Sequence, residues 1–123
     1  IMENLLIEIT EIQSYLETHI SGDTPAEIQE RGHNLSVYMA RTGHILAQAK
    51  QMLNEAKNYQ LISILNRFEN APKLAVNELV RSICSKEQYL VDWAERVNKS
   101  CTHQLDWMRT ALSYEKEQMR IIN

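Results

Sequence analysis

The stretch TPAEIQERGHNLSVYMARTGHILAQAKQMLNEAK, residues 24–57, decides the fold of this chain. It opens on a helix-start signal, because Thr24 can cap a helix, Pro25 suits the first helical position and Glu27 completes a capping box. Apolar and small residues then recur at alternating steps of four and three, which is a heptad pattern. No proline interrupts the pattern, so the sequence predicts one long helix over 25–57.

The flanking segments are also predicted to be helical. Apolar residues recur every three or four positions from Leu5 to Ile20, which predicts a first helix over about 3–20. Residues 58–70 are predicted as a short third helix. A strand over 59–65 is the alternative, because that run is apolar and partly β-branched.

The second half of the chain adds two helices. One begins after Pro72, and a last long helix over about 86–120 begins at a second capping box, where we expect a bend. At 1.5 Å per residue each long helix spans roughly 50 Å, against a diameter of about 35 Å for a compact globule of this size. The sequence therefore predicts a single all-α domain, 1–123. We expect an elongated antiparallel bundle of four to five helices, whose ends protrude or pack on another copy.

Composition excludes several classes of protein. With 3 Gly and 2 Pro in 123 residues, the chain lacks the turns of β-sandwiches and barrels and the glycine motifs of nucleotide-binding loops. A net charge of −3 argues against binding extended nucleic acid. No apolar run predicts a membrane span and no signal peptide is evident, so we expect a protein of the host cell cytosol. Cys84 and Cys101 form neither a disulfide framework nor a metal motif.

Small residues gather on one side of the 25–57 helix. Glycine inside a helix is unfavourable by about 1 kcal/mol relative to alanine, so two on one face call for a reason. The reason could be close packing against the last helix, a homo-oligomer contact or a ligand lying on bare backbone. This helix-packing stripe consists of Gly32, Ser36, Ala40, Gly43 and Ala47.

Neither metal nor nucleophile chemistry is predicted. Glu30 and His33 have the spacing found in di-iron bundles, but a second such motif is missing. His103 and Asp106 are only a partial substitute, and His33 lies about 16 Å along the helix from His44. We therefore expect no metal, no cofactor and no catalytic residue, and the chain is predicted not to be an enzyme.

A small anionic ligand is the better chemical prediction. Arginine, histidine and an aromatic ring are the usual groups that bind a phosphate and a base. Such residues cluster at helical spacing on both long helices. Because acidic residues lie near them, the clusters could equally be ordinary solvent-exposed helix faces. The candidate ligand-binding residues are Arg41, His44, Arg96, Lys99, His103 and Trp107.

The segments TPAEIQERGHNLSVYMARTGHILAQAK (24–50) and YLVDWAERVNKSCTHQLDWMRT (89–110) resemble small all-helical proteins encoded by phages and prophages. That group has no assigned activity, so the resemblance carries over no functional residues. It implies a cytosolic, non-enzymatic accessory protein that acts by binding.

Three functions are consistent with these features. The first is a phage accessory protein that sequesters a nucleotide-type host defence signal as a homo-oligomer. The second is an inhibitor or assembly factor that binds a host or phage protein through a helical surface. The third, and least favoured, is a metal-dependent helical-bundle enzyme.

Overall fold

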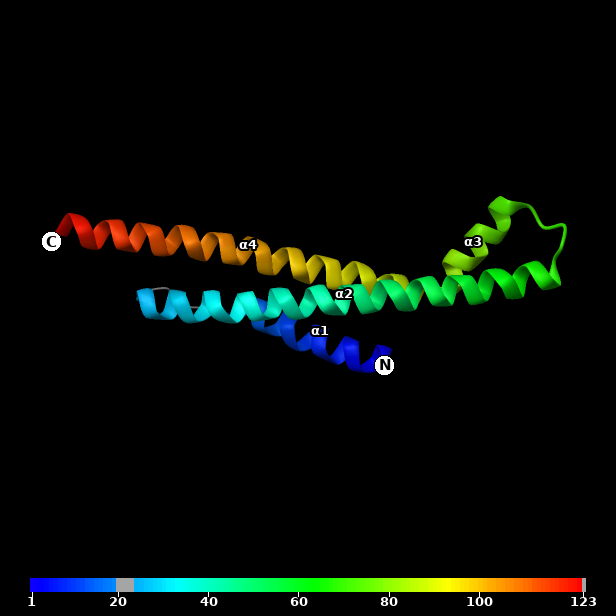
Figure 1. The fold of residues 1–123 in the computed structure, drawn as a ribbon, viewed down its shortest axis with the longest axis horizontal. Helices are drawn as coiled ribbons and strands as arrows, with labels where there is room; N and C mark the ends of the chain where they lie inside the picture. The colour runs from blue at the N-terminus through cyan, green and yellow to red at the C-terminus, as the bar shows by residue number, and fades with distance from the viewer. Residues whose placement is uncertain (20–23, 123) are drawn as a thin grey trace.

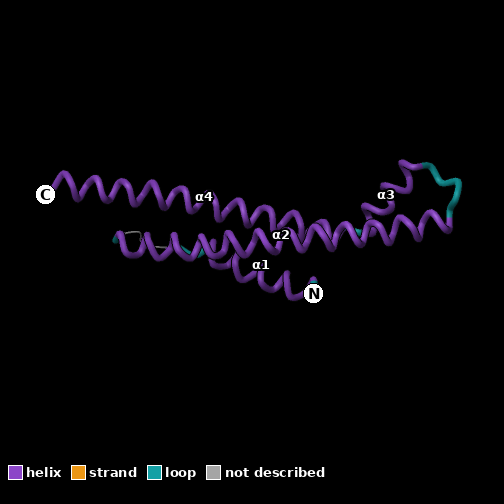
Figure 2. Tube along the Cα trace, viewed as in Figure 1, coloured by secondary structure: helices purple, strands orange, loops and turns teal. Residues whose placement is uncertain are grey.

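The computed structural model describes residues 1–19 and 24–122, and in these ranges the chain forms four helices (Figure 1). They are α1 (Met2–Leu16), α2 (Pro25–Arg67), α3 (Lys73–Ile83) and α4 (Ser85–Ile122). Within the described ranges no strand is present, and the tube drawing shows an elongated molecule of helices joined by loops (Figure 2). The predicted all-α bundle with two long helices is therefore confirmed.

The two long helices form the body of the molecule. α2 and α4 run antiparallel along much of their length, and the last turns of α4 extend beyond the start of α2 (Figure 1). Leu35 and Ile45 of α2 are fully buried, as are Leu90 and Cys101 of α4. α1 packs against both long helices and closes one side of this core. The heptad pattern of the sequence is thus the α2 side of the α2–α4 contact.

The start of α2 follows the prediction. The hydroxyl of Thr24 accepts a hydrogen bond from the backbone N–H of Glu27 at 3.2 Å, and Pro25 occupies the first turn. This bond satisfies one of the backbone donors that a helix start leaves free. The local signal in the sequence was sufficient here because capping depends only on neighbouring residues.

The predicted end of α2 was wrong. The helix does not stop at residue 57 but continues to Arg67, so the predicted separate helix over 58–70 does not exist. The alternative strand over 59–65 is also absent, because these residues are helical. Neither glycine nor proline occurs between Gly43 and Pro72, so nothing interrupts the hydrogen-bond ladder before the turn.

Other boundaries shift less. α1 ends at Leu16 rather than near residue 20, and the Thr18 hydroxyl bonds to the Tyr15 carbonyl at 2.5 Å just beyond it. Ile20 and the predicted helix end at 21–23 lie outside the described residues. The bend before the last helix is confirmed, because α3 ends at Ile83 and α4 begins at Ser85.

The helix-packing stripe lies only partly under α4. The nearest atom to a methyl group built on Gly32 would be Leu105 Cδ1 at 3.8 Å, and on Gly43 it would be Asn98 Nδ2 at 3.8 Å. Ser36, Ala40, Gly43 and Ala47 are exposed. α4 therefore lies beside both glycines, at a distance that leaves room for a side-chain methyl.

Gly43→Ala is expected to stabilise the isolated protein. Alanine costs less backbone entropy than glycine in a helix, and a contact at 3.8 Å needs no rearrangement. We expect a gain of about 0.5–1 kcal/mol and a rise in Tm of roughly 2–5 °C in thermal unfolding followed by circular dichroism. A lower Tm would show that the glycine face meets its neighbours more closely than the structure has it.

Candidate functional site

The six predicted ligand-binding residues lie in different surroundings. Arg41 and His44 face the region of α1, Arg96 and Lys99 line a shallow hollow with residues of α4, and Trp107 lines a pocket between α1, α2 and α4. The ring of His103 is exposed on α4. The structure therefore places the predicted ligand-binding residues in separate parts of the molecule, each with different neighbours.

Arg41 is held by a carboxylate from α1. Its guanidinium forms a two-pronged ion pair with Glu8, in which Nε and Nη2 both donate to carboxylate oxygens, the latter at 2.8 Å. The hydrogen bond from Arg41 lowers the pKa of Glu8, with a further contribution from the charges of Arg41 and His44. The predicted anion ligand Arg41 is therefore already paired, and its observed role is to attach α1 to α2.

This pair predicts a pH dependence of stability. Because the pKa of Glu8 is lower in the folded chain than its ordinary value of 4.5, the pair stabilises the fold above pH 4.5. The contribution is lost as the pH falls below 4.5 through the lower folded-state value. We expect Glu8→Gln to reduce the stability at pH 7 and to have a smaller effect near pH 3, as measured by urea unfolding. An equal effect of Glu8→Gln at both pH values would contradict the pairing.

The positive charges of Arg96 and Lys99 are neutralised by acidic side chains of the same helix, α4. Arg96 and Lys99 line a hollow of about 230 Å³ together with Asp92 and Glu95. The Lys99 ammonium lies 3.4 Å from a carboxylate oxygen of Glu95, and both side chains are largely exposed. The charges of the two acidic and two basic side chains sum to zero, so this hollow has little electrostatic attraction for an anion.

Trp107 lines a different pocket, which contains an arginine that the sequence prediction missed. The pocket has a volume of about 250 Å³ and lies where the end of α1 meets the first turns of α2 and the middle of α4. We call it the Arg31 pocket. Its lining residues are Leu16, Thr18, His19, Arg31, Gln104, Trp107 and Met108.

Arg31 is buried, with only 5% of its surface exposed. Its Nη1 donates to the Thr18 hydroxyl at 2.7 Å, and its Nη2 donates to Gln104 Oε1 at 2.9 Å and to the Leu16 carbonyl at 3.4 Å. The guanidinium carbon lies 4.2 Å from the centre of the Tyr15 ring, in a cation–π contact. These contacts orient the guanidinium at the edge of the pocket.

The charge of Arg31 lacks an ionic partner within residues 1–19 and 24–122. Among the residues that the structure describes, no carboxylate forms a salt bridge with Arg31, and its Nε is buried without a hydrogen-bond partner. A buried cation is costly unless an anion compensates it. The pocket beside Arg31 is thus the described place where an anion would gain most.

A signal for Arg31 was present in the sequence. On a helical wheel of α2 with Leu35 at 0°, Arg31 falls at about −40°, in the middle of the large apolar side chains. An arginine on the buried face of an amphipathic helix points to a bound anion or a buried polar network. The sequence prediction favoured residues on the polar face, where an exposed charge is ordinary.

The cysteines are poor nucleophiles in this fold. Both Cys84 and Cys101 are buried as free thiols, and burial raises the pKa of each. The charge of Arg31 and a hydrogen bond with Thr42 partly oppose that rise at Cys101. A thiol with a raised pKa is mostly protonated at neutral pH and so reacts slowly.

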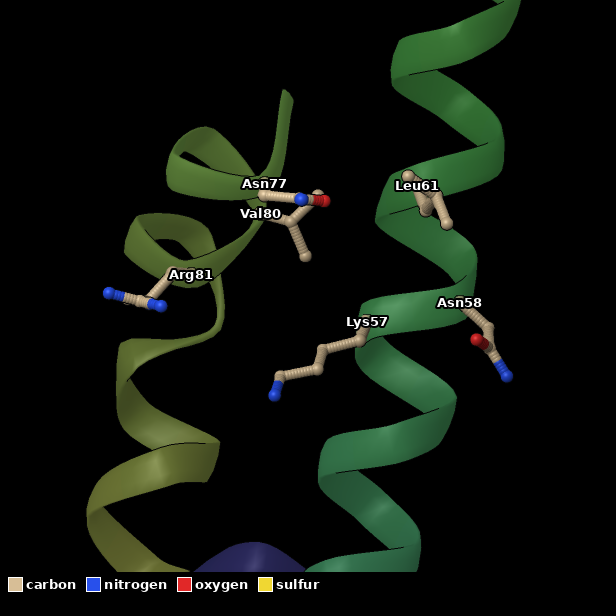
Figure 3. Close-up of a pocket in the computed structure, with 6 residues that line it drawn as sticks. All are labelled: Lys57, Asn58, Leu61, Asn77, Val80 and Arg81. Carbon is tan, nitrogen blue, oxygen red and sulfur yellow. The ribbon is translucent and has the colours of Figure 1, made fainter. Parts of the chain in front are cut away.

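A second hollow, of about 400 Å³, lies between α2 and α3 (Figure 3). Val80 and Lys57 extend into the gap between the two helices, whereas the end groups of Arg81 and Asn58 point away from it on opposite sides (Figure 3). Arg81 also pairs with Glu78 of its own helix at 3.6 Å. Because the polar groups diverge, this groove is less suited than the Arg31 pocket to hold a small ligand.

Metal-binding geometry and a membrane helix are not found in the described parts of the chain. Across residues 1–19 and 24–122, no group of three or more His, Cys, Asp or Glu side chains could hold a metal ion. Within the same ranges, none of the helices combines the length and the apolar character needed to cross a bilayer.

In comparisons with known proteins, no family, no curated protein and no solved structure matches this chain. The similarity to phage-encoded proteins stays a prediction from the sequence.

Proposed function

We propose that this protein is a non-catalytic binding protein that takes up a small phosphate-bearing ligand in the Arg31 pocket. The observation that supports the proposal is the buried guanidinium of Arg31, which faces a pocket and has no carboxylate partner in the described chain. A phosphate beside this group would gain a charge-assisted interaction with a guanidinium that is itself largely withdrawn from water.

The other lining residues suit a nucleotide. The His19 ring is a further polar group at this pocket, and the Gln104 amide keeps one N–H beyond the one that it donates to the Leu16 carbonyl. Trp107 is 60% exposed at the same pocket, so its ring is free to stack on a base. A volume of about 250 Å³ suits a phosphate and a sugar, with the base outside on Trp107.

The resemblance to phage-encoded proteins extends the proposal to a biological role. A non-enzymatic protein that holds a nucleotide without converting it would lower the free concentration of that nucleotide. Sequestration of a nucleotide-type host defence signal is the role that combines the resemblance with the Arg31 pocket.

Ligand titration of the full chain tests this proposal. We would compare inorganic phosphate, AMP, ATP and adenosine by isothermal titration calorimetry and thermal shift. We expect the phosphate-bearing compounds to bind and adenosine to have no effect. Trp107→Ala should weaken nucleotide binding about tenfold and leave phosphate binding unchanged, because the stack on a base contributes roughly 1–3 kcal/mol.

Tyr114→Ala is a matched control, since Tyr114 is 63% exposed on the same helix and does not line the pocket. It should leave every affinity unchanged. If the wild-type chain binds neither phosphate nor nucleotide, or if Trp107→Ala and Tyr114→Ala behave alike towards nucleotides, the proposal is wrong.

A further inference from the structure

Within residues 1–19 and 24–122, the hydrogen-bond acceptors of the Arg31 guanidinium are all electrically neutral. Nη1 donates to the Thr18 hydroxyl, and Nη2 donates to the Gln104 amide and to the Leu16 carbonyl. A buried arginine in a folded protein is usually paired with a carboxylate. These contacts therefore orient the guanidinium and leave its positive charge in place.

Gln104 of α4 occupies the position in this network at which a carboxylate would be expected. Its Oε1 accepts the hydrogen bond from Arg31 Nη2 at 2.9 Å. Glutamate has the length and shape of glutamine, so a glutamate here would also reach Arg31 and would form a charge-assisted ion pair. The glutamine amide makes the same contact without adding a negative charge.

The orientation of the Gln104 amide is set by its two partners. Arg31 can only donate and the Leu16 carbonyl can only accept, so Oε1 must face Arg31 while Nε2 donates to Leu16 at 3.0 Å. Because Arg31 also donates to the same carbonyl, the three groups form a closed triangle between α1, α2 and α4. The triangle uses one of the two N–H groups of Nε2 and holds the guanidinium in one orientation.

The charge of the pocket follows from this arrangement. Of the residues described as lining it, Arg31 and His19 can carry a positive charge, and none has a carboxylate. A buried charge without a compensating partner is unfavourable for folding. A neutral side chain at position 104 therefore has no advantage for stability over a carboxylate that would pair with Arg31, but it preserves the positive charge for a ligand.

We propose that Gln104 determines the anion specificity of the Arg31 pocket, because its neutral amide orients the guanidinium without cancelling its charge. This role rests on the proposed ligand binding, and it adds the residue that sets which sign of charge the ligand must carry. A phosphate at Arg31 would also receive the second N–H of the Gln104 amide. A carboxylate at the same position would cancel the charge of Arg31 and repel the phosphate oxygens.

Gln104→Glu tests the proposal, and Gln104→Met is its matched control. Glutamate keeps the contact with Arg31 and adds a negative charge, whereas methionine removes the contact and adds no charge. In calorimetry with inorganic phosphate and with AMP, we expect Gln104→Glu to weaken binding about 100-fold and Gln104→Met to weaken it less than about tenfold. A purely structural role predicts the reverse order, since Gln104→Met loses both hydrogen bonds of the amide.

The pH dependence of stability is a second measurement, and it needs no ligand. The new carboxylate of Gln104→Glu should pair with Arg31, so its pKa should lie below the unfolded value of about 4.3. The stabilisation is then present above pH 4.3 and is lost as the pH falls through the lower folded value. In urea unfolding, the stability of Gln104→Glu relative to the wild type should therefore rise from pH 3 to pH 7. That of Gln104→Met should not, and His19, the other titratable group that lines the pocket, is common to all three proteins.

The outcomes separate this role from the proposed function. A Gln104→Glu variant that binds phosphate and AMP like the wild type overturns the role of Gln104 and leaves the proposed function intact. A relative stability of Gln104→Glu that falls from pH 3 to pH 7 also overturns it, because Arg31 would then already have an anionic partner. A wild type that binds no phosphate-bearing ligand overturns the proposed function itself, and the specificity role with it.

Discussion

Arg31→Met is expected to abolish the response of the protein to phosphate and to nucleotides. The guanidinium is the one buried cation that lines the described Arg31 pocket, and a ligand phosphate would depend on its charge. Loss of a charge-assisted contact to a buried guanidinium weakens binding by about 10- to 100-fold. Calorimetry with the nucleotide that binds the wild type best measures this loss.

The ligand-free stability of Arg31→Met distinguishes a binding residue from a structural one. Methionine fills a similar volume but has neither N–H groups nor a charge. The hydrogen bonds to Thr18, Leu16 and Gln104 are therefore lost, and the cost of burying a charge is lost as well. We expect these effects to offset each other to within about 2 kcal/mol in urea unfolding. A loss above about 4 kcal/mol would indicate that Arg31 serves chiefly to hold α1 and α4 to α2.

Arg96→Met is the matched control for this experiment. Arg96 belongs to the predicted ligand set but lies in the neutralised hollow on α4. Its replacement should leave nucleotide affinity within about twofold of the wild type. If Arg96→Met removes binding and Arg31→Met does not, the ligand binds on the outer face of α4, as the sequence alone suggested.

Leu35→Ala is expected to have the largest effect on stability. Leu35 is fully buried between the long helices, so its truncation removes apolar contact and leaves a cavity in the α2–α4 core. Truncations of this kind cost about 3–5 kcal/mol. Urea unfolding followed by circular dichroism gives the change in the free energy of unfolding.

Val37→Ala, two residues further along the same helix, provides the contrast. Val37 is 54% exposed, and alanine is a better helix former than valine, so the change should stay within about 0.5 kcal/mol. Similar losses for both variants would mean that the face of α2 that packs on α4 has been placed wrongly.

Much of the fold was predictable because it depends on neighbouring residues. The cap at Thr24, the break between Ile83 and Ser85 and the buried stripe of α2 each follow from short-range patterns. The end of α2 was not predictable in the same way. The residues after 57 are weak but acceptable helix formers, and they continue the helix because no glycine or proline ends it before the turn at Pro72.

Most of the candidate site, in contrast to the fold, could not be predicted from the sequence. Trp107, which the sequence suggested as a ligand-binding candidate, lines a pocket, and Arg41 is exposed on α2 as its position on the polar side indicated. Spacing along one helix could not show that Glu8 from α1 would pair with Arg41. It also could not show that Arg31 would meet Thr18 and Gln104.

By itself, the sequence determined that this chain is helical, elongated and built on one long heptad-patterned helix, because helix formation and amphipathicity are read from residues three and four positions apart. The tertiary structure decided which of the charged side chains in the described ranges are paired and which are buried. Those properties depend on side chains that meet from α1, α2 and α4, up to 88 positions apart in the case of Leu16 and Gln104. The burial of the Arg31 charge, on which the proposed function depends, arises from that meeting of three helices.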